Sequence, residues 1–396
     1  MKIMIMTENP HFHTGMALVG REIACYLATH GFEVIYGGWG ISGKPNDFPF
    51  MLYEFARDKI VQCFDEVILK ERPQYVLTIG DAWMTKFMAD PQECRSRNYF
   101  QWVNYIAVDG LNINNEIPTW WNGLVNNADY LIAYTDYGQR ALQSAFFDYK
   151  IPVIEHGICE RTFFPLDKQE CRKELKLPED KFIFLFVGRN QPRKNIPELF
   201  KIWKEYIKHD KNALLFTHFN FNDPAGIPVE DFLFEYGLYD SHTIIFMDKV
   251  AYSKQTQYQV TPETLNKIYN ASDAYINISS EGFGLPIGEA MATKTPCLLL
   301  DHSAGSCLGA CGRAEFIKVG FKMTGMYKTE CTFPSIEDAV QKMLKIRNAD
   351  NTEMVENAYN YIRTLTWNKI GEKWATFFNK VDAPFNYPLI LEEVTA

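Results

Sequence analysis

Short apolar runs alternate with amphipathic stretches along this chain. Runs such as KIMIM, EVIYGG, FQWVNYIAV and YLIAYT predict buried strands, and the apolar periodicity of residues 16–30 predicts a helix that ends at Gly31. The same alternation continues in the second half with FIFLFVG, ALLFTHF, TIIFM and DAYINIS. Strands that alternate with helices are typical of a parallel sheet covered on both faces. The pattern therefore predicts an α/β fold.

The alternation starts twice. IPVIEHGI predicts the last strand of a first series, and a charged stretch over residues 166–181 leads to a second series. A chain of 396 residues also exceeds what one hydrophobic core usually organises. We therefore expect an N-terminal domain over residues 1–165 and a C-terminal domain over residues 166–366. Residues 367–396 hold an amphipathic pattern that predicts a helix crossing back to the first domain.

Composition and charge exclude several classes of protein. Hydrophobic residues make up 47% of the chain, which is too apolar for a disordered protein. No apolar run reaches the roughly 18 residues that cross a bilayer, and the start of the chain lacks a signal-peptide core. The net charge of −9 argues against nucleic-acid binding. We expect a cytoplasmic protein without a transmembrane segment, and a peripheral contact with a membrane stays open.

The segment SSEGFGLPIGEAMA carries the strongest chemical signal, because it follows one predicted strand and opens a helix. Gly282 and Gly284 allow the backbone to approach a ligand closely, and Pro286 suits a first helical turn. The free amides and the dipole at such a helix start bind anions. Glu281 and Glu289 suit neutral hydroxyl groups instead, one on a ribose and one on a sugar. The segment therefore predicts a nucleotide-sugar site.

The segment GRNQPRKN supplies the opposite charge after another predicted strand. Arg189 offers a planar fork to phosphate oxygens, and Lys194 offers a compact charge. A basic loop alone is usually a solvated surface. Ligands in doubly wound sheets bind beyond the carboxyl ends of the strands, where this loop and the acidic segment both lie. We therefore expect the two cations to neutralise a departing nucleoside diphosphate.

Together, GRNQPRKN and EGFGLPIGEAMA resemble the motifs of the retaining glycosyltransferases of family 4, the glycosyl transferases group 1, in which two glutamates flank seven residues. The similarity extends through HTGMA, IEHGICERTFFP, TIIFMDKV, LNKIYNASDAYI and LTWNKIGEKW, and so over nearly the whole chain. The resemblance implies a GT-B fold, which consists of two doubly wound Rossmann-like domains that face each other across a cleft.

The resemblance also implies roles for the matched residues. Arg189 and Lys194 would hold the diphosphate, and Glu281 would bind the hydroxyls of the donor sugar. The other residues implied in donor binding are Glu289 at the ribose, Gly282, Phe283, Gly284 and Leu285 around the sugar and phosphates, Gly15 in the first domain, and Lys249 and Val250 beside the base.

Two positions depart from the family pattern. Val108 stands where many relatives have a histidine before Asp109, and Asp248 replaces the usual glycine of the base-side loop. Asp109 and His156 are the remaining candidates for the cleft. A capping residue or a packed core residue is the alternative for each of them.

No metal or cofactor is expected, because no Asp-x-Asp triplet occurs and the nine cysteines are scattered. The expected reaction is retaining transfer of a hexose-type sugar from a UDP- or GDP-sugar to a glycan or other hydroxyl acceptor. The alternatives are a glycoside phosphorylase, a sugar-nucleotide epimerase or a catalytically silent nucleotide-sugar-binding protein. The base, the sugar, the acceptor and the oligomeric state stay open.

Overall fold

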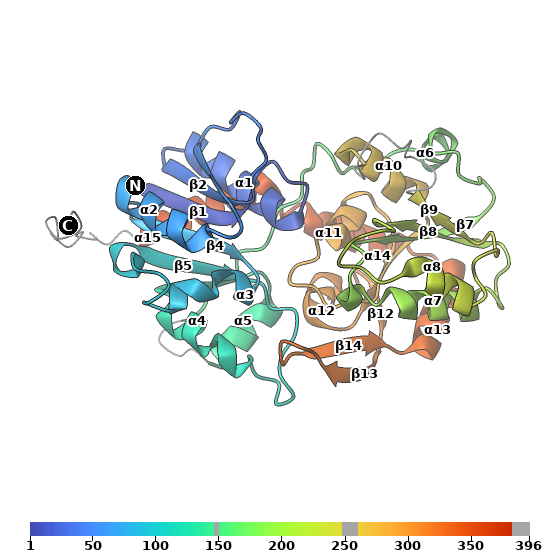
Figure 1. Cartoon of the computed structure of the whole chain (residues 1–396). Coiled ribbons are helices and arrows are strands. Elements are labelled where there is room, and N and C mark those ends of the chain that lie inside the picture. Colours follow the sequence, from blue (N-terminus) through green and yellow to red (C-terminus); the bar gives the residue numbers. More distant parts are fainter. Residues whose placement is uncertain (146–149, 248–259, 382–396) are drawn as a thin grey trace, which may run out of the picture. The chain divides into compact units, whose positions relative to one another are not determined.

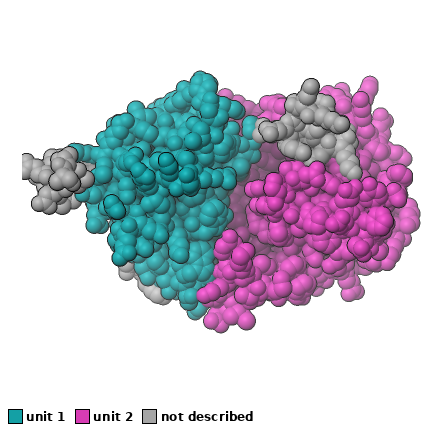
Figure 2. Space-filling view, in the orientation of Figure 1, with its two compact units in different colours: residues 1–108, 115–157, 367–396 teal, residues 109–114, 158–366 magenta. Residues whose placement is uncertain are grey.

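The computed structural model describes residues 1–145, 150–247 and 260–381 (Figure 1). The chain divides into two compact units, which Figure 2 shows in different colours. Unit 1 contains residues 1–108, 115–157 and 367–396, and unit 2 contains residues 109–114 and 158–366. Among the described helices, each is too short or too polar to span a membrane.

Unit 1 is built on a parallel sheet with the strand order β3-β2-β1-β4-β5-β6. This order is that of a doubly wound dinucleotide-binding fold. Its strands are β1 (Lys2–Glu8), β2 (Glu33–Trp39), β3 (Met51–Phe55), β4 (Tyr75–Gly80), β5 (Gln101–Ile106) and β6 (Tyr130–Ala133). Its helices are α1 (Gly15–Thr29), α2 (Ile60–Glu71), α3 (Ala82–Thr85), η1 (Lys86–Ala89), η2 (Arg97–Tyr99), η3 (Thr119–Trp121), α4 (Asn122–Asn127), α5 (Asp136–Gln143) and α15 (Trp367–Lys380).

The sequence explains the ends of α1. The side chain of Thr14 accepts a hydrogen bond from the Ala17 amide at 3.2 Å, so it caps the start of the helix. Gly31 follows the helix with a φ of 89°, a left-handed conformation that glycine adopts without strain. These two residues fix the length of α1 and the turn into β2.

Helix α15 belongs to unit 1 although it lies at the other end of the sequence. It packs against α1, where Gly371 faces the ring of Tyr26 so closely that a larger side chain would overlap it. Trp374 is fully buried, with its ring 5.0 Å from that of Tyr105 in β5. The helix therefore completes the core of unit 1.

Unit 2 repeats the same architecture. Its parallel sheet has the order β12-β11-β10-β7-β8-β9, which is the order of unit 1 when the strands are counted from β7, and β13 pairs with β14 in a separate antiparallel hairpin. The strands are β7 (Phe182–Val187), β8 (Ala213–His218), β9 (Ile244–Phe246), β10 (Ala274–Asn277), β11 (Cys297–Leu300), β12 (Glu315–Ile317), β13 (Val319–Thr324) and β14 (Glu330–Pro334). The helices are α6 (Lys168–Glu174), η4 (Pro192–Lys194), α7 (Ile196–Tyr206), α8 (Val229–Glu235), α10 (Pro262–Ala271), α11 (Leu285–Ala292), α12 (Ser303–Gly309), α13 (Ile336–Asn348) and α14 (Thr352–Ile362).

Alternate strand residues form the core of unit 2. Phe184, Ile276 and Leu298 are fully buried and share one apolar cluster with Trp203 of α7 and Met343 of α13. Side chains on a strand alternate between the two faces of its sheet, so this cluster marks the face that α7 and α13 cover. The apolar runs of the sequence thus become fully buried parallel strands, and the predicted α/β class is confirmed.

One predicted strand is wrong. IPVIEHGI makes only two single bridges, from Val153 to Ala133 and from Ile158 to Thr366. The first bridge lies in unit 1 and the second in unit 2, because the chain leaves one unit for the other between Gly157 and Ile158. A segment that passes between two compact units cannot complete a strand in either. The second unit accordingly begins at residue 158, not at residue 166.

Candidate active site

In the sheet of unit 2, the order in which successive strands are added reverses between the neighbouring strands β7 and β10. Strands β8 and β9 extend the sheet on one side of this point, and β11 and β12 extend it on the other. Ligands of open α/β sheets bind beyond the carboxyl ends of the strands at such a point. The loop over residues 188–195 follows β7 and carries the basic motif, and the loop over residues 278–284 follows β10 and carries the acidic motif. The topology therefore brings the two motifs together.

Lys194 and Glu281 form the centre of this site. The Lys194 ammonium donates to Glu281 Oε1, and both side chains are buried. The same carboxylate oxygen accepts a hydrogen bond of 2.8 Å from Ser279 Oγ and a longer one of 3.4 Å from Asn277 Nδ2. Nη1 of Arg193 lies 3.5 Å from the other oxygen, Oε2. Glu281 is thus surrounded by donors.

The surroundings keep Glu281 ionised. Burial alone would raise its pKa, but the positive charges of Lys194 and then Arg193 outweigh burial and lower the pKa to about 2. For Lys194, burial lowers the pKa, and the opposing attraction of Glu281 is joined by that of Asp109. The two groups are therefore an ion pair, with the carboxylate as the strongly stabilised anion.

Asp109 belongs to unit 2 and not, as the sequence predicts, to the N-terminal domain. The short segment Asp109–Asn114 is fixed to the β13–β14 hairpin, where the Glu330 amide donates to the Leu111 carbonyl at 2.7 Å. The charge of Asp109 acts on Lys194. Of the predicted catalytic residues, Asp109, Lys194 and Glu281 are therefore brought together.

Arg189 has a different partner from the one expected. Its Nε lies 2.6 Å and its Nη2 3.3 Å from the two carboxylate oxygens of Asp223, so the guanidinium fork already faces a carboxylate. The hydrogen bond and charge of Arg189, together with the Ala225 amide, lower the pKa of Asp223. The family resemblance assigns this fork to the diphosphate, so a donor would compete with Asp223 for it.

The side chain of the next residue, Asn190, joins the loop after β7 to the loop after β8 through hydrogen bonds. Its fully buried side chain donates to the carbonyls of Phe221 and Ile227 at 3.3 and 3.0 Å and accepts from the Ile227 amide at 3.1 Å. A Cβ on Gly226 would lie only 2.6 Å from Asn190 Cγ. The close packing of the two loops therefore requires glycine at residue 226.

Helix α11 begins directly after the loop that carries Glu281. Gly284 precedes it with a φ of 86°, a conformation that favours glycine, and a Cβ there would lie 2.8 Å from Ile287 Cδ1. Pro286 occupies the first turn, and Phe283 is buried. The predicted place of Pro286 in the first helical turn is thus observed, and the helix start lies beside Glu281.

Glu289 is buried in α11, not solvated. Its Oε2 accepts a hydrogen bond of 2.8 Å from the hydroxyl of Tyr269 in α10. Burial raises the pKa of Glu289 to about 7, and the hydrogen bond from Tyr269 only partly opposes that rise. The carboxyl therefore titrates near neutrality, which the sequence did not predict.

The unit 1 candidates divide into two kinds. Gly15 is the first residue of α1, at the end of the loop that follows β1. His156 is buried, with its ring 4.4 Å from that of Tyr134 and 5.6 Å from that of Tyr105, and burial lowers its pKa to about 3. A neutral packed residue is what this environment favours. Lys249 and Val250 lie outside the described residues.

Four residues of the site were not assigned from the sequence. Arg193 lies in the basic motif, and it reaches Glu281 from η4. No local pattern connects Tyr269 with Glu289, or Asn277 and Ser279 with a ligand site. Their polar character inside otherwise apolar segments was the available signal, because buried polar groups require partners.

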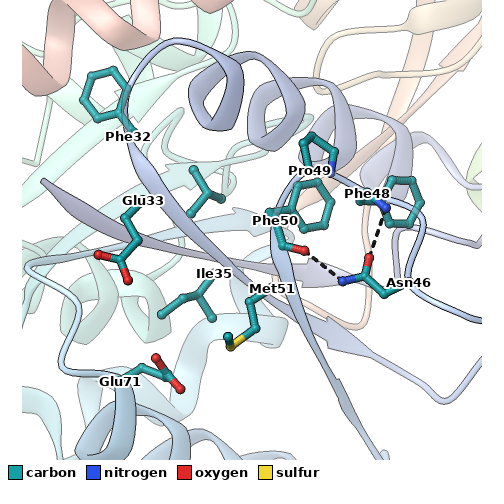
Figure 3. Close-up of a pocket in the computed structure, with 10 residues that line it drawn as sticks. Phe32, Glu33, Ile35, Asn46, Phe48, Pro49, Phe50, Met51 and Glu71 are labelled. Carbon is teal, nitrogen blue, oxygen red and sulfur yellow. Dashed lines mark hydrogen bonds between the residues drawn. The ribbon is translucent and has the colours of Figure 1, made fainter.

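A cavity of about 630 Å³ lies elsewhere, in unit 1, along β2 and the segment before β3 (Figure 3). Its walls are largely apolar. The side-chain amide of Asn46, which lines the cavity, donates a hydrogen bond of 2.8 Å to the Phe50 carbonyl. The carboxylates of Glu33 and Glu71 both pair with Lys2. None of the predicted site residues lines this cavity, so we do not assign the chemistry to it.

Comparisons with known proteins agree with the motifs of unit 2. Residues 181–318 match the family model described as Glycosyl transferases group 1. A stretch of 73 residues is 36% identical to the D-inositol 3-phosphate glycosyltransferase of Nocardioides sp., and it covers 18% of this chain and 16% of that relative's length.

Solved structures resemble the whole chain at low identity. A sucrose-phosphate synthase from Thermosynechococcus elongatus aligns with a TM-score of 0.75 and 18% identity over 96% of this chain and 98% of that chain. A glycosyltransferase from Rickettsia africae aligns with a TM-score of 0.69 and 16% identity over 96% of this chain and 98% of that chain. HepE of Anabaena, solved in complex with UDP and glucose, aligns with a TM-score of 0.71 and 14% identity over 96% of this chain and 100% of that chain.

These likenesses show the fold, and the family model covers the part of unit 2 that carries both motifs. The predicted GT-B architecture of two Rossmann-like units is confirmed. Residues 181–318 thus match the glycosyl transferases group 1, and the whole chain shares its fold with solved structures that include a sucrose-phosphate synthase.

Proposed function

We propose that the protein is a retaining glycosyltransferase that moves a hexose-type sugar from a UDP- or GDP-sugar to a glycan or other hydroxyl acceptor without a metal ion. The observation that carries the proposal is the buried contact of Lys194 with Glu281 beside the start of α11, at the point where the strand order reverses. Cations, a carboxylate and helix amides meet there, as a sugar diphosphate requires.

Each group has a task on the donor. Lys194 and Arg193 supply positive charge to the diphosphate, and the amides at the start of α11 supply hydrogen bonds. Glu281, which is held as an anion, accepts hydrogen bonds from hydroxyls of the sugar. Glu289 accepts them from the ribose when it is ionised, as its raised pKa permits above neutrality.

The reaction breaks the bond between the anomeric carbon and the diphosphate oxygen, and that oxygen keeps the electron pair. An acceptor oxygen forms the new bond on the same face of the sugar, and its proton passes to the departing diphosphate. Negative charge therefore grows on the phosphate oxygens in the transition state. Preorganised cations and amides that face this charge lower the barrier.

The choice of donor rests on relatives. HepE of Anabaena was solved with UDP and glucose, and a trehalose-6-phosphate enzyme from E. coli with a TM-score of 0.69 was solved with UDP-2-fluoro glucose. Both share the fold of this chain at 14% and 12% identity. They support a UDP-sugar as the first donor to test, with GDP-sugars second.

The test begins with donor binding to the full chain. Melting temperatures are measured with UDP-, GDP- and ADP-sugars, and the sugar that stabilises the protein is then used with acceptors while the release of nucleotide is followed. We expect Lys194→Ala to lower turnover about 100-fold, since it removes a charge from the leaving group. Lys204→Ala, an exposed lysine of α7, serves as the matched control.

Three outcomes contradict parts of the proposal. Turnover of a disaccharide with inorganic phosphate and no nucleotide would indicate a phosphorylase. A β-linked product from an α-linked donor, seen by proton NMR, would exclude retention. Activity that EDTA abolishes and magnesium or manganese restores would exclude a metal-independent mechanism.

A further inference from the structure

The hairpin of β13 and β14 stands apart from the main sheet of unit 2 (Figure 1). Its strands pair in antiparallel register, with Lys322 opposite Thr332 and Met323 opposite Cys331. The turn is closed by the Gly325 amide, which donates to the Thr329 carbonyl at 2.7 Å. A two-stranded hairpin is rarely stable unless another surface supports it.

One face of the hairpin is fastened to the site. Thr332 Oγ1 lies 2.5 Å from Ser280 Oγ in the loop that precedes Glu281, and the Thr332 carbonyl accepts from Asn195 Nδ2 at 2.8 Å. Asn195 ends the basic loop in a left-handed conformation. The hairpin is therefore held in place by both loops of the candidate active site.

The other face and the turn are apolar and exposed. Successive residues of a strand point to opposite faces, so Phe321 and Met323 lie on the face away from Lys322 and Thr332. Phe321 is 56% exposed and Met323 55%, although the Phe321 ring stacks on that of Phe333. At the turn, Met326 is 89% exposed and Tyr327 52%. An exposed apolar cluster of this kind marks an interaction surface.

The hairpin and the residue before it carry more positive than negative charge. Residues 318–334 contain Lys318, Lys322 and Lys328 and one acidic residue, Glu330 of β14, whereas the chain as a whole has a net charge of −9. Lys318 and Lys328 are exposed, and the Lys318 ammonium lies 4.0 Å from Oδ1 of Asp338 in α13. Lysines beside methionine and aromatic side chains match the boundary between lipid headgroups and acyl chains.

We propose that the β13–β14 hairpin docks this protein on the surface of an anionic lipid bilayer. Met326, Tyr327, Phe321 and Met323 enter the headgroup boundary, and the lysines contact the acidic headgroups. A second copy of the chain fits less well, because a symmetric pairing of hairpins brings lysines against lysines. One apolar hairpin with few cations gives reversible binding rather than permanent anchoring.

The proposal stands independently of the proposed transfer reaction, because it uses only the exposed face of the hairpin. If both hold, bilayer binding keeps the donor loops close to the headgroups, since Thr332 joins the hairpin to the loop of Glu281. An acceptor carried by a lipid would then be presented near the donor.

The experiment is flotation of the full chain with vesicles, without donor or acceptor. One set contains phosphatidylcholine alone, and the other also contains phosphatidylserine. We expect the anionic set to bind the protein about tenfold more strongly, and added salt to weaken that binding. Met326→Glu and the double variant Lys318→Glu/Lys328→Glu should each reduce binding about tenfold.

Matched substitutions elsewhere on unit 2 control for general effects. Phe234→Glu changes another exposed aromatic residue, in α8, and Lys204→Glu reverses another exposed lysine, in α7. Both should bind vesicles as the unaltered chain does. Equal binding to the two vesicle sets, or full binding by Met326→Glu, would overturn the proposal. So would a concentration-dependent dimer that Met326→Glu dissociates without any vesicle binding, since the hairpin would then join two copies.

Discussion

At the scale of single residues, Glu281 and Glu289 show how surroundings separate two identical side chains. Both are buried in or beside α11. Lys194 and Arg193 lower the pKa of Glu281 to about 2, whereas Glu289 has only the Tyr269 hydroxyl, so burial raises its pKa to about 7. Carboxyl groups with pKa values pushed apart commonly mark a functional site.

Removing Lys194 should destabilise the fold as well as remove activity. In Lys194→Met, Glu281 stays buried without its closest cation, which typically costs about 3 kcal/mol in the free energy of unfolding. The double variant Lys194→Met/Glu281→Gln should recover most of that loss but no activity. Urea unfolding of the single and double variants measures this. A double variant no more stable than Lys194→Met would show that the pair does not act as an ion pair.

Glu289 should make the stability depend on pH. Its pKa is about 7 in the folded chain, against the ordinary glutamate value of 4.5 that applies once the chain unfolds, so between these values the folded state holds a proton that the unfolded state has lost. The contribution to stability is therefore complete below about pH 4.5 and is lost as pH rises through 7.

Glu289→Gln should remove this dependence. Relative to the unaltered chain, the variant should gain about 2.5 kcal/mol in the free energy of unfolding between about pH 5 and pH 8. Urea unfolding at both pH values gives the difference, and Glu353→Gln on the exposed side of α14 is the control. A gain equal to that of Glu353→Gln would show that Glu289 titrates normally.

At the scale of elements, two loops of unit 2 act as one. Asn190 and Arg189 follow β7, and their side chains hold the segment from Phe221 to Ile227, which follows β8. The basic loop thus gains its conformation from a neighbouring loop and not from its own sequence. Lys194 and Arg193 of this loop already lie beside Glu281, and such preorganised charge is what electrostatic catalysis requires.

Gly226→Ala should disturb both loops, because the new Cβ would lie 2.6 Å from Asn190 Cγ and 2.9 Å from the Asn190 carbonyl oxygen. We expect a loss of about 1–3 kcal/mol in the free energy of unfolding and weaker binding of the nucleotide. Thermal unfolding and nucleotide titration test this. Gly123→Ala is the control, since its nearest contact would be an ordinary 3.6 Å to Ala89. Unchanged nucleotide affinity in Gly226→Ala would argue against a linked pair of loops.

At the scale of the whole molecule, helix α15 near the end of the described chain packs into the core of unit 1, which the first residues of the chain begin. Helix α15 supplies Ile370, Trp374 and Phe378 to the core of unit 1, and Tyr75 of β4 donates to the Val381 carbonyl at 2.5 Å. Unit 1 is therefore built from segments at opposite ends of the sequence.

Trp374→Ala should lower the free energy of unfolding by about 3–5 kcal/mol, since it empties a large buried volume. Glu372→Ala, an exposed neighbour on the same helix, should have little effect. Denaturant unfolding compares the two. Equal stabilities would show that α15 does not contribute to the core of unit 1.

Local sequence predicted several of the strands. FIFLFVG coincides with β7, because a short and continuous apolar run fits a strand that is buried on both faces of a parallel sheet. Gly284 was expected to allow a close approach of the backbone, and it adopts a left-handed conformation that its lack of a side chain permits. The seven-residue spacing of Glu281 and Glu289 needed no tertiary information, and it lies within residues 181–318, which match the family model of the glycosyl transferases group 1.

Tertiary structure decided the partners of charged and polar groups. Asp223 takes Arg189 across 34 residues of sequence, Tyr269 reaches Glu289 across 20, and Lys194 meets Glu281 across 87. IPVIEHGI failed as a strand because its ends lie in different units, and Asp109 joins unit 2 through a hairpin more than 200 residues later. The spacing of apolar residues along the chain predicts which residues are buried, and this spacing can be read from a short stretch of sequence. Which groups share that burial depends on the strand order, and so only the folded chain reveals it.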